Sequence, residues 1–223
     1  MLEQSDKSVT VFKEVEDARS PIKRIPYGYY LEGVAKKRGL LLKGNHFVNE
    51  ETGEIEYGQI CEDRLFGRCK INNRNKKIPV PSSLTNSRIR EKAKKELFSF
   101  ARKRQPKRDE LMSEVKSKIE ESVKEKLRAD KVIFYSAIGT SLDYNYGIDG
   151  WIEITKNGET TTITIDLKNG QYDEIDVAAN VVLVTKLKTH KQQDISEIMP
   201  DFPEFVENIA KEYEEINSYK KYL

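Results

Sequence analysis

The chain has 223 residues, of which 34% are charged and 37% are hydrophobic, and its formal net charge is +2. This composition excludes a disordered chain, because the hydrophobic fraction is sufficient for a buried core. No apolar run approaches the roughly 20 residues that a membrane helix needs, and the first residues lack a signal-peptide core. We therefore expect a folded cytoplasmic protein with no membrane contact.

The charge is distributed unevenly along the chain. From Arg64 to Arg108 the sequence has 16 Lys or Arg and two acidic residues, whereas residues 192–223 have eight acidic residues and three lysines. Dense positive charge is typical of surfaces that contact a polyphosphate backbone, although lysine-rich helices also form plain solvated surfaces. The clustered arginines within residues 102–108 favour nucleic acid, and we expect this basic segment to bind DNA.

The first part of the chain is predicted to be irregular with strand content. Strands are predicted at residues 9–12 and 27–30, and a hairpin is predicted between residues 46–48 and 55–57. A helix is predicted over residues 87–103, because small and apolar residues recur there at intervals of four. It is interrupted at Gln105-Pro106. We divide the chain there, into a substrate-recognition or accessory region at 1–105 and a core at 106–223.

The second part alternates between helical and strand patterns. A core-facing helix is predicted over residues 108–128, and Glu120 falls on the edge of its apolar stripe. Buried strands are predicted at residues 132–138 and 181–184. A last helix is predicted from Asp201 onward, again with an apolar stripe. Elements of both kinds in this order predict an α/β (α+β) protein.

Residues 147–168 are predicted to form an antiparallel hairpin. Apolar and polar residues alternate on both sides of a polar turn that contains Gly158. On the second strand, Asp166 and Lys168 point to one face and the intervening apolar residues point to the other. The pairing could bring Asp149 beside them.

Two carboxylates and one ammonium group on one sheet face allow two interpretations. Such groups are costly in a plain core, but they suit a divalent cation and an activated water. The alternative is an ordinary hairpin with a solvated polar face, in which Asp166 and Lys168 form a surface ion pair worth well under about 1 kcal/mol.

The order of the elements and the acidic motif together resemble the PD-(D/E)xK nuclease superfamily. The matching residues are Asp149 at the start of the second strand and Asp166, Leu167 and Lys168 on the third strand, after an amphipathic helix. The resemblance covers roughly residues 108–187. It implies a restriction-endonuclease-like mixed central β-sheet flanked by helices, preceded here by an N-terminal extension with strands and helices.

The same resemblance implies a set of functional residues. Asp149 and Asp166 would bind Mg²⁺ or Mn²⁺, the backbone carbonyl of Leu167 would complete the metal shell, and Lys168 would orient or polarise the attacking water. Several members of the superfamily add an acidic residue from the preceding helix, and Glu120 is the candidate for it here.

From these observations we expect a metal-dependent endonuclease that hydrolyses DNA phosphodiester bonds, of a restriction, repair, recombination or mobile-element type. A site-specific enzyme of this kind would act as a homodimer, with one active site for each strand. The alternative is a non-catalytic nucleic-acid-binding or assembly protein that retains a nuclease-like sheet. The sequence leaves open whether the substrate is DNA or RNA and whether cleavage is internal or from an end.

Overall fold

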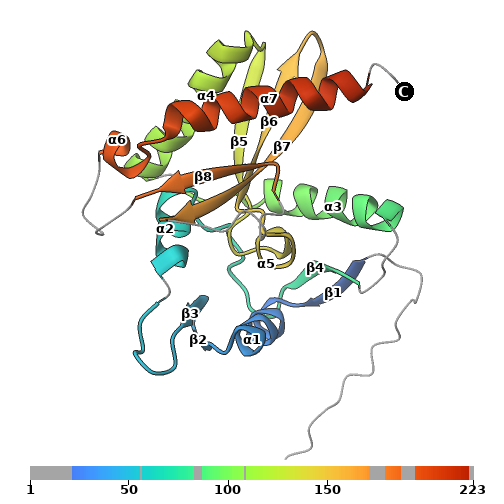
Figure 1. Cartoon of the computed structure of the whole chain (residues 1–223). Coiled ribbons are helices and arrows are strands. Elements are labelled where there is room, and N and C mark those ends of the chain that lie inside the picture. Colours follow the sequence, from blue (N-terminus) through green and yellow to red (C-terminus); the bar gives the residue numbers. More distant parts are fainter. Residues whose placement is uncertain are drawn as a thin grey trace, which may run out of the picture.

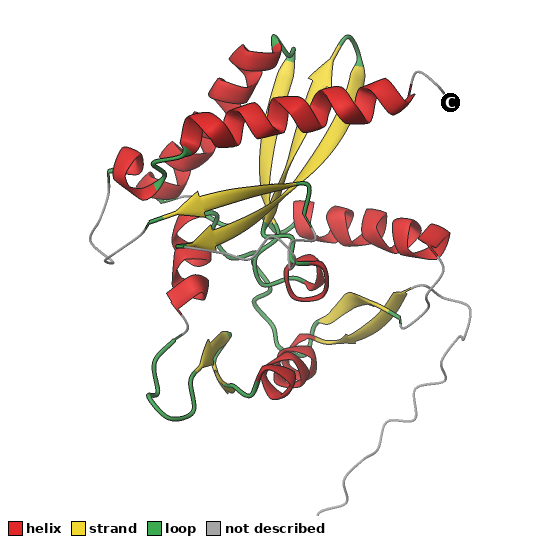
Figure 2. Cartoon of the chain, in the orientation of Figure 1, coloured by secondary structure: helices red, strands yellow, loops and turns green. Residues whose placement is uncertain are grey.

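The computed structural model describes residues 22–55, 57–82, 87–107, 109–170, 179–186 and 194–220, and the strand predicted at residues 9–12 lies outside them. The described part combines helices with three small β-sheets (Figures 1 and 2). The protein is therefore a mixed α/β protein, as predicted at this coarser level. Within these ranges, no helix is both long enough and apolar enough to cross a membrane.

The largest sheet has four strands in the order β5-β6-β7-β8. β5 (Lys131–Ser136), β6 (Gly150–Lys156) and β7 (Glu159–Asn169) are antiparallel neighbours, and β8 (Val181–Thr185) runs parallel to β7. The turn between β6 and β7 contains Gly158 at φ 79°. The predicted hairpin is thereby confirmed, together with the buried strands on either side of it.

Two long helices cover one face of this sheet and pack against each other (Figure 1). α4 (Glu110–Leu127) begins after Asp109, whose side chain accepts a hydrogen bond from Met112 N at 2.9 Å and so caps the helix. α7 (Phe202–Lys220) follows a short helix, α6 (Ile195–Ile198). The stripes predicted for α4 and α7 are buried against the sheet in one cluster, which includes Val115, Ile119, Val123, Ile152, Ile163, Ile165, Phe205 and Ile209.

A third helix, α3 (Ser87–Arg102), covers part of the opposite face. Trp151 on β6 is fully buried there, because side chains alternate between faces along a strand and its neighbour Ile152 belongs to the main core. The Trp151 ring centroid lies 4.9 Å from that of Phe98 on α3 and 5.0 Å from that of Tyr135 on β5. These rings hold α3 against the sheet.

The first part of the chain forms smaller elements. β1 (Ile22–Pro26) pairs antiparallel with β4 (Lys77–Pro81), and α1 (Tyr27–Arg38) follows β1 directly. The strand predicted at residues 27–30 is therefore wrong. These residues form the first turn of α1, where Tyr27, Tyr30 and Leu31 are buried at helical spacing. A run of four residues is too short for its pattern to separate the two periods.

The predicted hairpin between residues 46–48 and 55–57 is confirmed only at its first pair, Val48 and Ile55, and Tyr57 already begins a helix. β3 (His46–Val48) pairs with β2 (Leu41–Lys43), and Val48 makes a single bridge to Ile55. Two residues separate β2 from β3, and Gly44 there has φ 63°. A two-residue turn with positive φ is the preferred hairpin connection, which explains the choice of partner.

The helix α2 (Tyr57–Leu65) connects the first part of the chain to the large sheet. It precedes residue 105, yet Cys61 and Leu65 are buried in the same cluster as Ile119 of α4 and Ile163 of β7. The site described below is built from residues on both sides of the division at 105 and 106.

Candidate functional site

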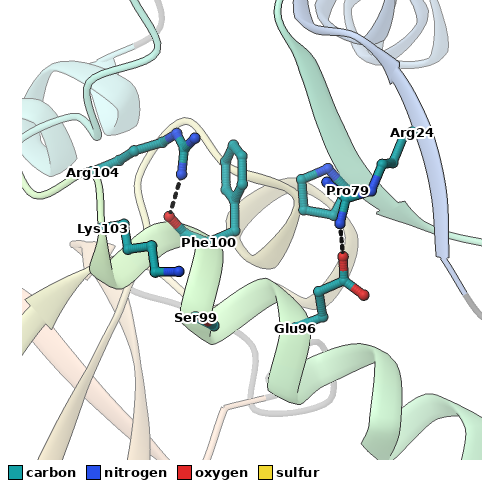
Figure 3. A pocket seen from close by; sticks show the side chains of 7 residues that line it. All are labelled: Arg24, Pro79, Glu96, Ser99, Phe100, Lys103 and Arg104. Carbon is teal, nitrogen blue, oxygen red and sulfur yellow. Dashed lines mark hydrogen bonds and ion pairs between the residues drawn. The ribbon is translucent and has the colours of Figure 1, made fainter.

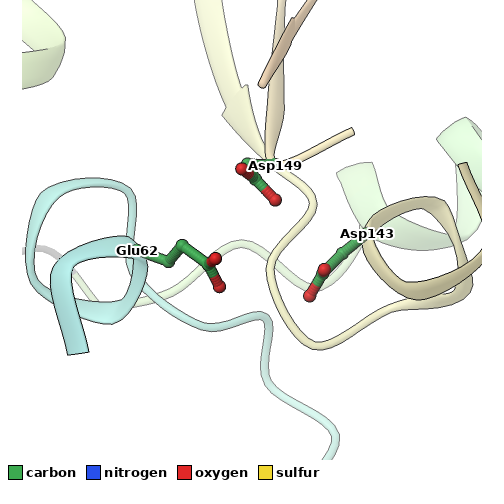
Figure 4. Close-up of side chains that lie close together, drawn as sticks. All are labelled: Glu62, Asp143 and Asp149. Atoms are coloured by element: carbon green, nitrogen blue, oxygen red, sulfur yellow. The ribbon is translucent and has the colours of Figure 1, made fainter. Parts of the chain in front are cut away.

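Three carboxylates from separate elements converge at one end of the large sheet. Glu62 projects from α2, Asp143 from α5 (Ser141–Tyr146), and Asp149 from the segment that enters β6 (Figure 4). One oxygen of each carboxylate lies within 4.8 Å of the others. Asp143 and Asp149 are buried and Glu62 is partly buried. We call these three residues, together with Asp166, the acidic cluster.

The cap of α5 fixes the position of Asp143. Thr140 Oγ1 accepts a hydrogen bond from Leu142 N at 3.2 Å, and Asp143 Oδ2 accepts one from Gly139 N at 2.8 Å. Gly139 has φ 80°, a conformation that glycine adopts without strain. The tight turn before α5 thus orders the Asp143 side chain before any ligand binds.

Backbone hydrogen bonds hold Asp149 between two strands. Asp149 O accepts from Ala137 N at 2.8 Å, and Asp149 N donates to Ile165 O at 2.9 Å. Its side chain is also ordered, because Oδ2 accepts from Leu167 N at 2.7 Å. That bond ties Asp149 directly to the segment of β7 that carries Asp166.

Asp166 and Lys168 form an ion pair beside Asp149. The Lys168 Nζ lies 3.0 Å from Asp166 Oδ2, and the side chains are 36% and 3% exposed, respectively. A carboxylate this deeply buried is not part of a solvated hairpin face, so the surface-pair interpretation is wrong.

Burial raises the pKa of the clustered carboxyls. It raises the pKa of Glu62 from its ordinary 4.5 to about 8, and the neighbouring Asp143 charge adds to the effect. Burial raises the pKa of Asp143 to about 6, although the hydrogen bond from Gly139 N opposes this shift. The pKa of Asp149 lies well above its ordinary value, because burial and the surrounding carboxyls act in the same direction. Such a cluster retains protons near neutral pH unless a cation compensates its charge.

Arg68 supplies part of the compensating positive charge. Its Nε lies 3.0 Å from Asp63 Oδ1, and its Nη1 donates to the Tyr144 hydroxyl at 2.7 Å. The guanidinium charge lowers the pKa of Glu62 and Asp143, but burial outweighs it at both residues. The Arg68 charge is therefore too small an effect to return the pKa values of Glu62 and Asp143 to their ordinary range.

Lys168 keeps its proton in this environment. Burial alone would lower its pKa, but the hydrogen bond and charge of Asp166 outweigh burial, and Asp149 adds to them. The net result is a raised pKa, so that the ammonium group is a donor and an electrostatic partner for anions rather than a base.

The structure brings together three of the four predicted side chains. Asp149, Asp166 and Lys168 meet at the start of β6 and near the end of β7, and the backbone of Leu167 lies beside them. Glu120 is not brought into this group: its Oε1 accepts a hydrogen bond from Phe134 N at 2.7 Å. Phe134 lies on β5, which β6 separates from β7.

Sequence reasoning missed Glu62 and Asp143. For Asp143 a signal is present in the sequence, because Thr140 and Asp143 have the three-residue spacing of a capping box. For Glu62 the signal is weaker: Cys61 and Leu65 are four residues apart and mark a short buried helix face. Neither pattern indicates that the two acids would meet Asp149.

The acidic cluster has the chemical character of a site for a hard divalent cation. Its four side chains offer carboxylate oxygens, which Mg²⁺, Mn²⁺ and Ca²⁺ prefer to nitrogen or sulfur ligands. The ammonium of Lys168 at its edge can hold an anionic group next to such a cation. Comparison with protein-family models, curated proteins and solved structures finds no significant match to this chain.

Proposed function

We propose that the protein is a metal-dependent nuclease that hydrolyses DNA phosphodiester bonds at the acidic cluster. The observation that carries the proposal is the convergence of Glu62, Asp143 and Asp149 within 4.8 Å, next to the buried Asp166–Lys168 pair. Buried carboxyls that raise one another's pKa are costly for folding unless they bind a ligand of opposite charge. The proposed ligand is Mg²⁺ or Mn²⁺.

Asp149, Asp166 and Glu62 would hold the cation, with the Leu167 carbonyl as a backbone ligand. Asp143, fixed by the Gly139 N–H, would add a fourth carboxylate to the same space. When bound, a divalent cation at such a site lowers the pKa of a coordinated water and neutralises charge on a phosphoryl group. Glu62 takes the role that Glu120 has in the sequence-based hypothesis, namely that of the helix-borne acid.

Lys168 would stabilise the negative charge that develops during phosphodiester cleavage. Its raised pKa keeps the group protonated, so it can donate to a phosphoryl oxygen or orient the attacking water. Asp166, 3.0 Å away, fixes the position of the ammonium. Glu62, whose pKa of about 8 keeps it protonated near neutral pH in the cation-free protein, would release its proton when the cation binds.

The arrangement of the core supports the resemblance to PD-(D/E)xK nucleases. α4 precedes the antiparallel strands β5, β6 and β7, and β8 is parallel to β7. The acidic residues lie where β6 begins and on the second half of β7, as the motif requires. We propose that this unit is a restriction-endonuclease-like core and that the elements before it contribute substrate binding as well as Glu62.

The decisive experiment measures cleavage of DNA by the purified protein. Duplex, single-stranded and branched DNA would be incubated with Mg²⁺, with Mn²⁺ and with chelator alone. We expect cleavage only with a divalent cation. The Asp166→Asn variant should lose cleavage while it still binds DNA, whereas Glu121→Gln, which removes an exposed acid from α4, should cleave as the wild type does.

Two outcomes would contradict the proposal. If the wild type binds all three DNA forms but cuts none with either cation, the protein is a nucleic-acid-binding protein rather than a nuclease. If Asp166→Asn retains full cleavage, the chemistry takes place elsewhere. Cleavage assays with RNA substrates of the same lengths would show whether the enzyme accepts ribose as well as deoxyribose.

A further inference from the structure

A basic pocket lies away from the acidic cluster, between α3 and the ribbon formed by β1 and β4. Its volume is about 230 Å³. Figure 3 shows Lys103 and Arg104 on one side of this pocket and Arg24 with Glu96 on the other. The lining residues are Arg24, Pro79, Glu96, Ser99, Phe100, Lys103 and Arg104.

The cations of the pocket are incompletely compensated. Arg24 is paired with Glu96, which is the one acidic side chain in the lining. In the described structure, neither Lys103 nor Arg104 pairs with a carboxylate. Three cations and one anion leave the pocket with surplus positive charge, so an anionic ligand would be attracted to it.

Arg104 lines this pocket and has an unused hydrogen-bond donor. Its guanidinium carbon lies 3.7 Å from the centroid of the Phe100 ring, and Nη1 donates to Phe100 O at 2.9 Å. Its Nε is buried and has no hydrogen-bond partner within the ranges described. A buried guanidinium donor without an acceptor carries a desolvation cost, which a bound anion would remove.

The size and chemistry of the pocket favour a phosphate group attached to a small organic residue. A volume of about 230 Å³ is below the roughly 300–1,000 Å³ of pockets that hold whole drug-sized ligands. Arginine and lysine recognise phosphate oxygens, and the Phe100 ring and Ser99 hydroxyl can contact a sugar. These features fit one nucleotide unit of a polynucleotide strand.

A short, rigid path connects the pocket to the acidic cluster. Arg104 is followed by Gln105, whose Nε2 donates to Ser136 O at 2.9 Å and whose Oε1 accepts from Ser136 N at 2.8 Å. Ser136 pairs with Gly150, the residue after Asp149. A group bound at Arg104 is therefore held in a fixed position relative to the carboxylates.

We infer that this pocket binds a backbone phosphate of the polynucleotide, separate from the scissile phosphate, and positions the strand along α3. The inference rests on the proposed nuclease function, because it treats the pocket as a subsite of the same substrate. Lys103 and Arg104 are the phosphate ligands, and Phe100 and Ser99 contact the attached sugar.

The test measures oligonucleotide binding by fluorescence anisotropy in chelator, where no cleavage occurs. Lys103→Gln and Arg104→Gln should each weaken binding about tenfold, as expected for one charge-assisted hydrogen bond. Each should also reduce the slope of log affinity against log salt concentration by about one. Lys124→Gln, which removes an exposed charge from α4, is the matched control and should bind as the wild type does. Thermal denaturation of each variant identifies any loss of fold, and the exposed Lys103 keeps the test valid if Arg104→Gln does not fold.

The outcomes separate this inference from the proposed function. Unchanged oligonucleotide binding in folded Lys103→Gln would overturn the subsite, even if the wild type cleaves DNA. Weakened binding in both variants would support it, even if the wild type cuts nothing with Mg²⁺. Titration with inorganic phosphate and with a deoxynucleoside monophosphate distinguishes the source of the phosphate: if the variants lose only the affinity for these small ligands, the pocket binds a free nucleotide and the strand assignment is wrong.

Discussion

Replacing Glu62 with glutamine should make the cation-free protein more stable at neutral pH. Glu62 lies within 4.8 Å of Asp143 and Asp149 and has a pKa raised to about 8. An acid with a raised pKa binds a proton more tightly in the folded state than in the unfolded state. Its contribution to stability is therefore complete below its ordinary pKa of 4.5 and is lost as the pH rises toward 8.

The magnitude follows from the linkage between protonation and folding. Between pH 5 and pH 7, the folded protein keeps a proton on Glu62 that the unfolded chain has released, which costs about 1.4 kcal/mol per pH unit. The wild type should therefore lose about 3 kcal/mol of unfolding free energy over this interval from Glu62 alone. Asp143, with a pKa raised to about 6, acts in the same direction. Glu62→Gln cannot titrate at this position, so its stability should fall less steeply.

The assay is urea denaturation at several pH values between 5 and 8, in chelator and in Mg²⁺. In chelator, the free energy of unfolding of Glu62→Gln should exceed that of the wild type, and the difference should be largest at the upper end of this pH range. In Mg²⁺ the order should reverse, because the variant loses a ligand and gains less from the cation. Glu121→Gln removes an exposed carboxylate and should follow the wild type throughout.

The reasoning would be refuted by a wild type whose stability in chelator is constant or increases from pH 5 to pH 8. Equal pH slopes for the wild type and Glu62→Gln would also refute it. Either result would mean that Glu62 is not held among other buried carboxyls.

Three further predictions concern neighbours of the acidic cluster. Lys168→Met should reduce the cleavage rate about 100-fold, as the loss of one electrostatic donor does elsewhere, while Mn²⁺ binding measured by calorimetry persists; a wild-type rate would exclude Lys168 from the chemistry. Gly150→Ala would place a Cβ 2.7 Å from Phe134 Cζ, so we expect about 1–3 kcal/mol of lost stability in thermal denaturation and weaker cation binding at the adjacent Asp149. Stability and cation binding equal to those of the wild type would show that the strands can move apart at Gly150. Glu120→Ala should cost about 1 kcal/mol through the lost hydrogen bond to Phe134 N without slowing cleavage. A large loss of activity at unchanged stability would instead place Glu120 in the site.

Local periodicity accounts for the part of the fold that could be predicted. In α4, Val115, Ile119 and Val123 recur at the helical period, and the structure buries all three. In β7, alternation sends Asp166 to one face and Ile165 to the other. Where the pattern was short, as at residues 27–30 and 46–48, it did not determine the element or its partner, because several local pairings satisfy the same few residues.

In the candidate site, too, local periodicity predicted some features and left others undetermined. The sequence by itself determined that Asp166 and Lys168 share a strand face, since the pleat fixes side-chain direction at each alternate residue. The position of Asp149 beside them depended on the pairing of the strands. Whether that face is solvated or buried depended on what covers it. The 3% exposure of the Asp166 side chain is a property of the packed molecule and not of the strand.

Only the tertiary structure decided which other acids join the site. Glu62 precedes Asp149 by more than 80 residues in the sequence and reaches it because α2 buries Cys61 and Leu65 in the main core. Glu120, which has a suitable helical phase, is instead bound to the backbone of β5. Helical phase fixes the direction of a side chain around its own axis, whereas the position of that axis is fixed by contacts among residues far apart in the chain.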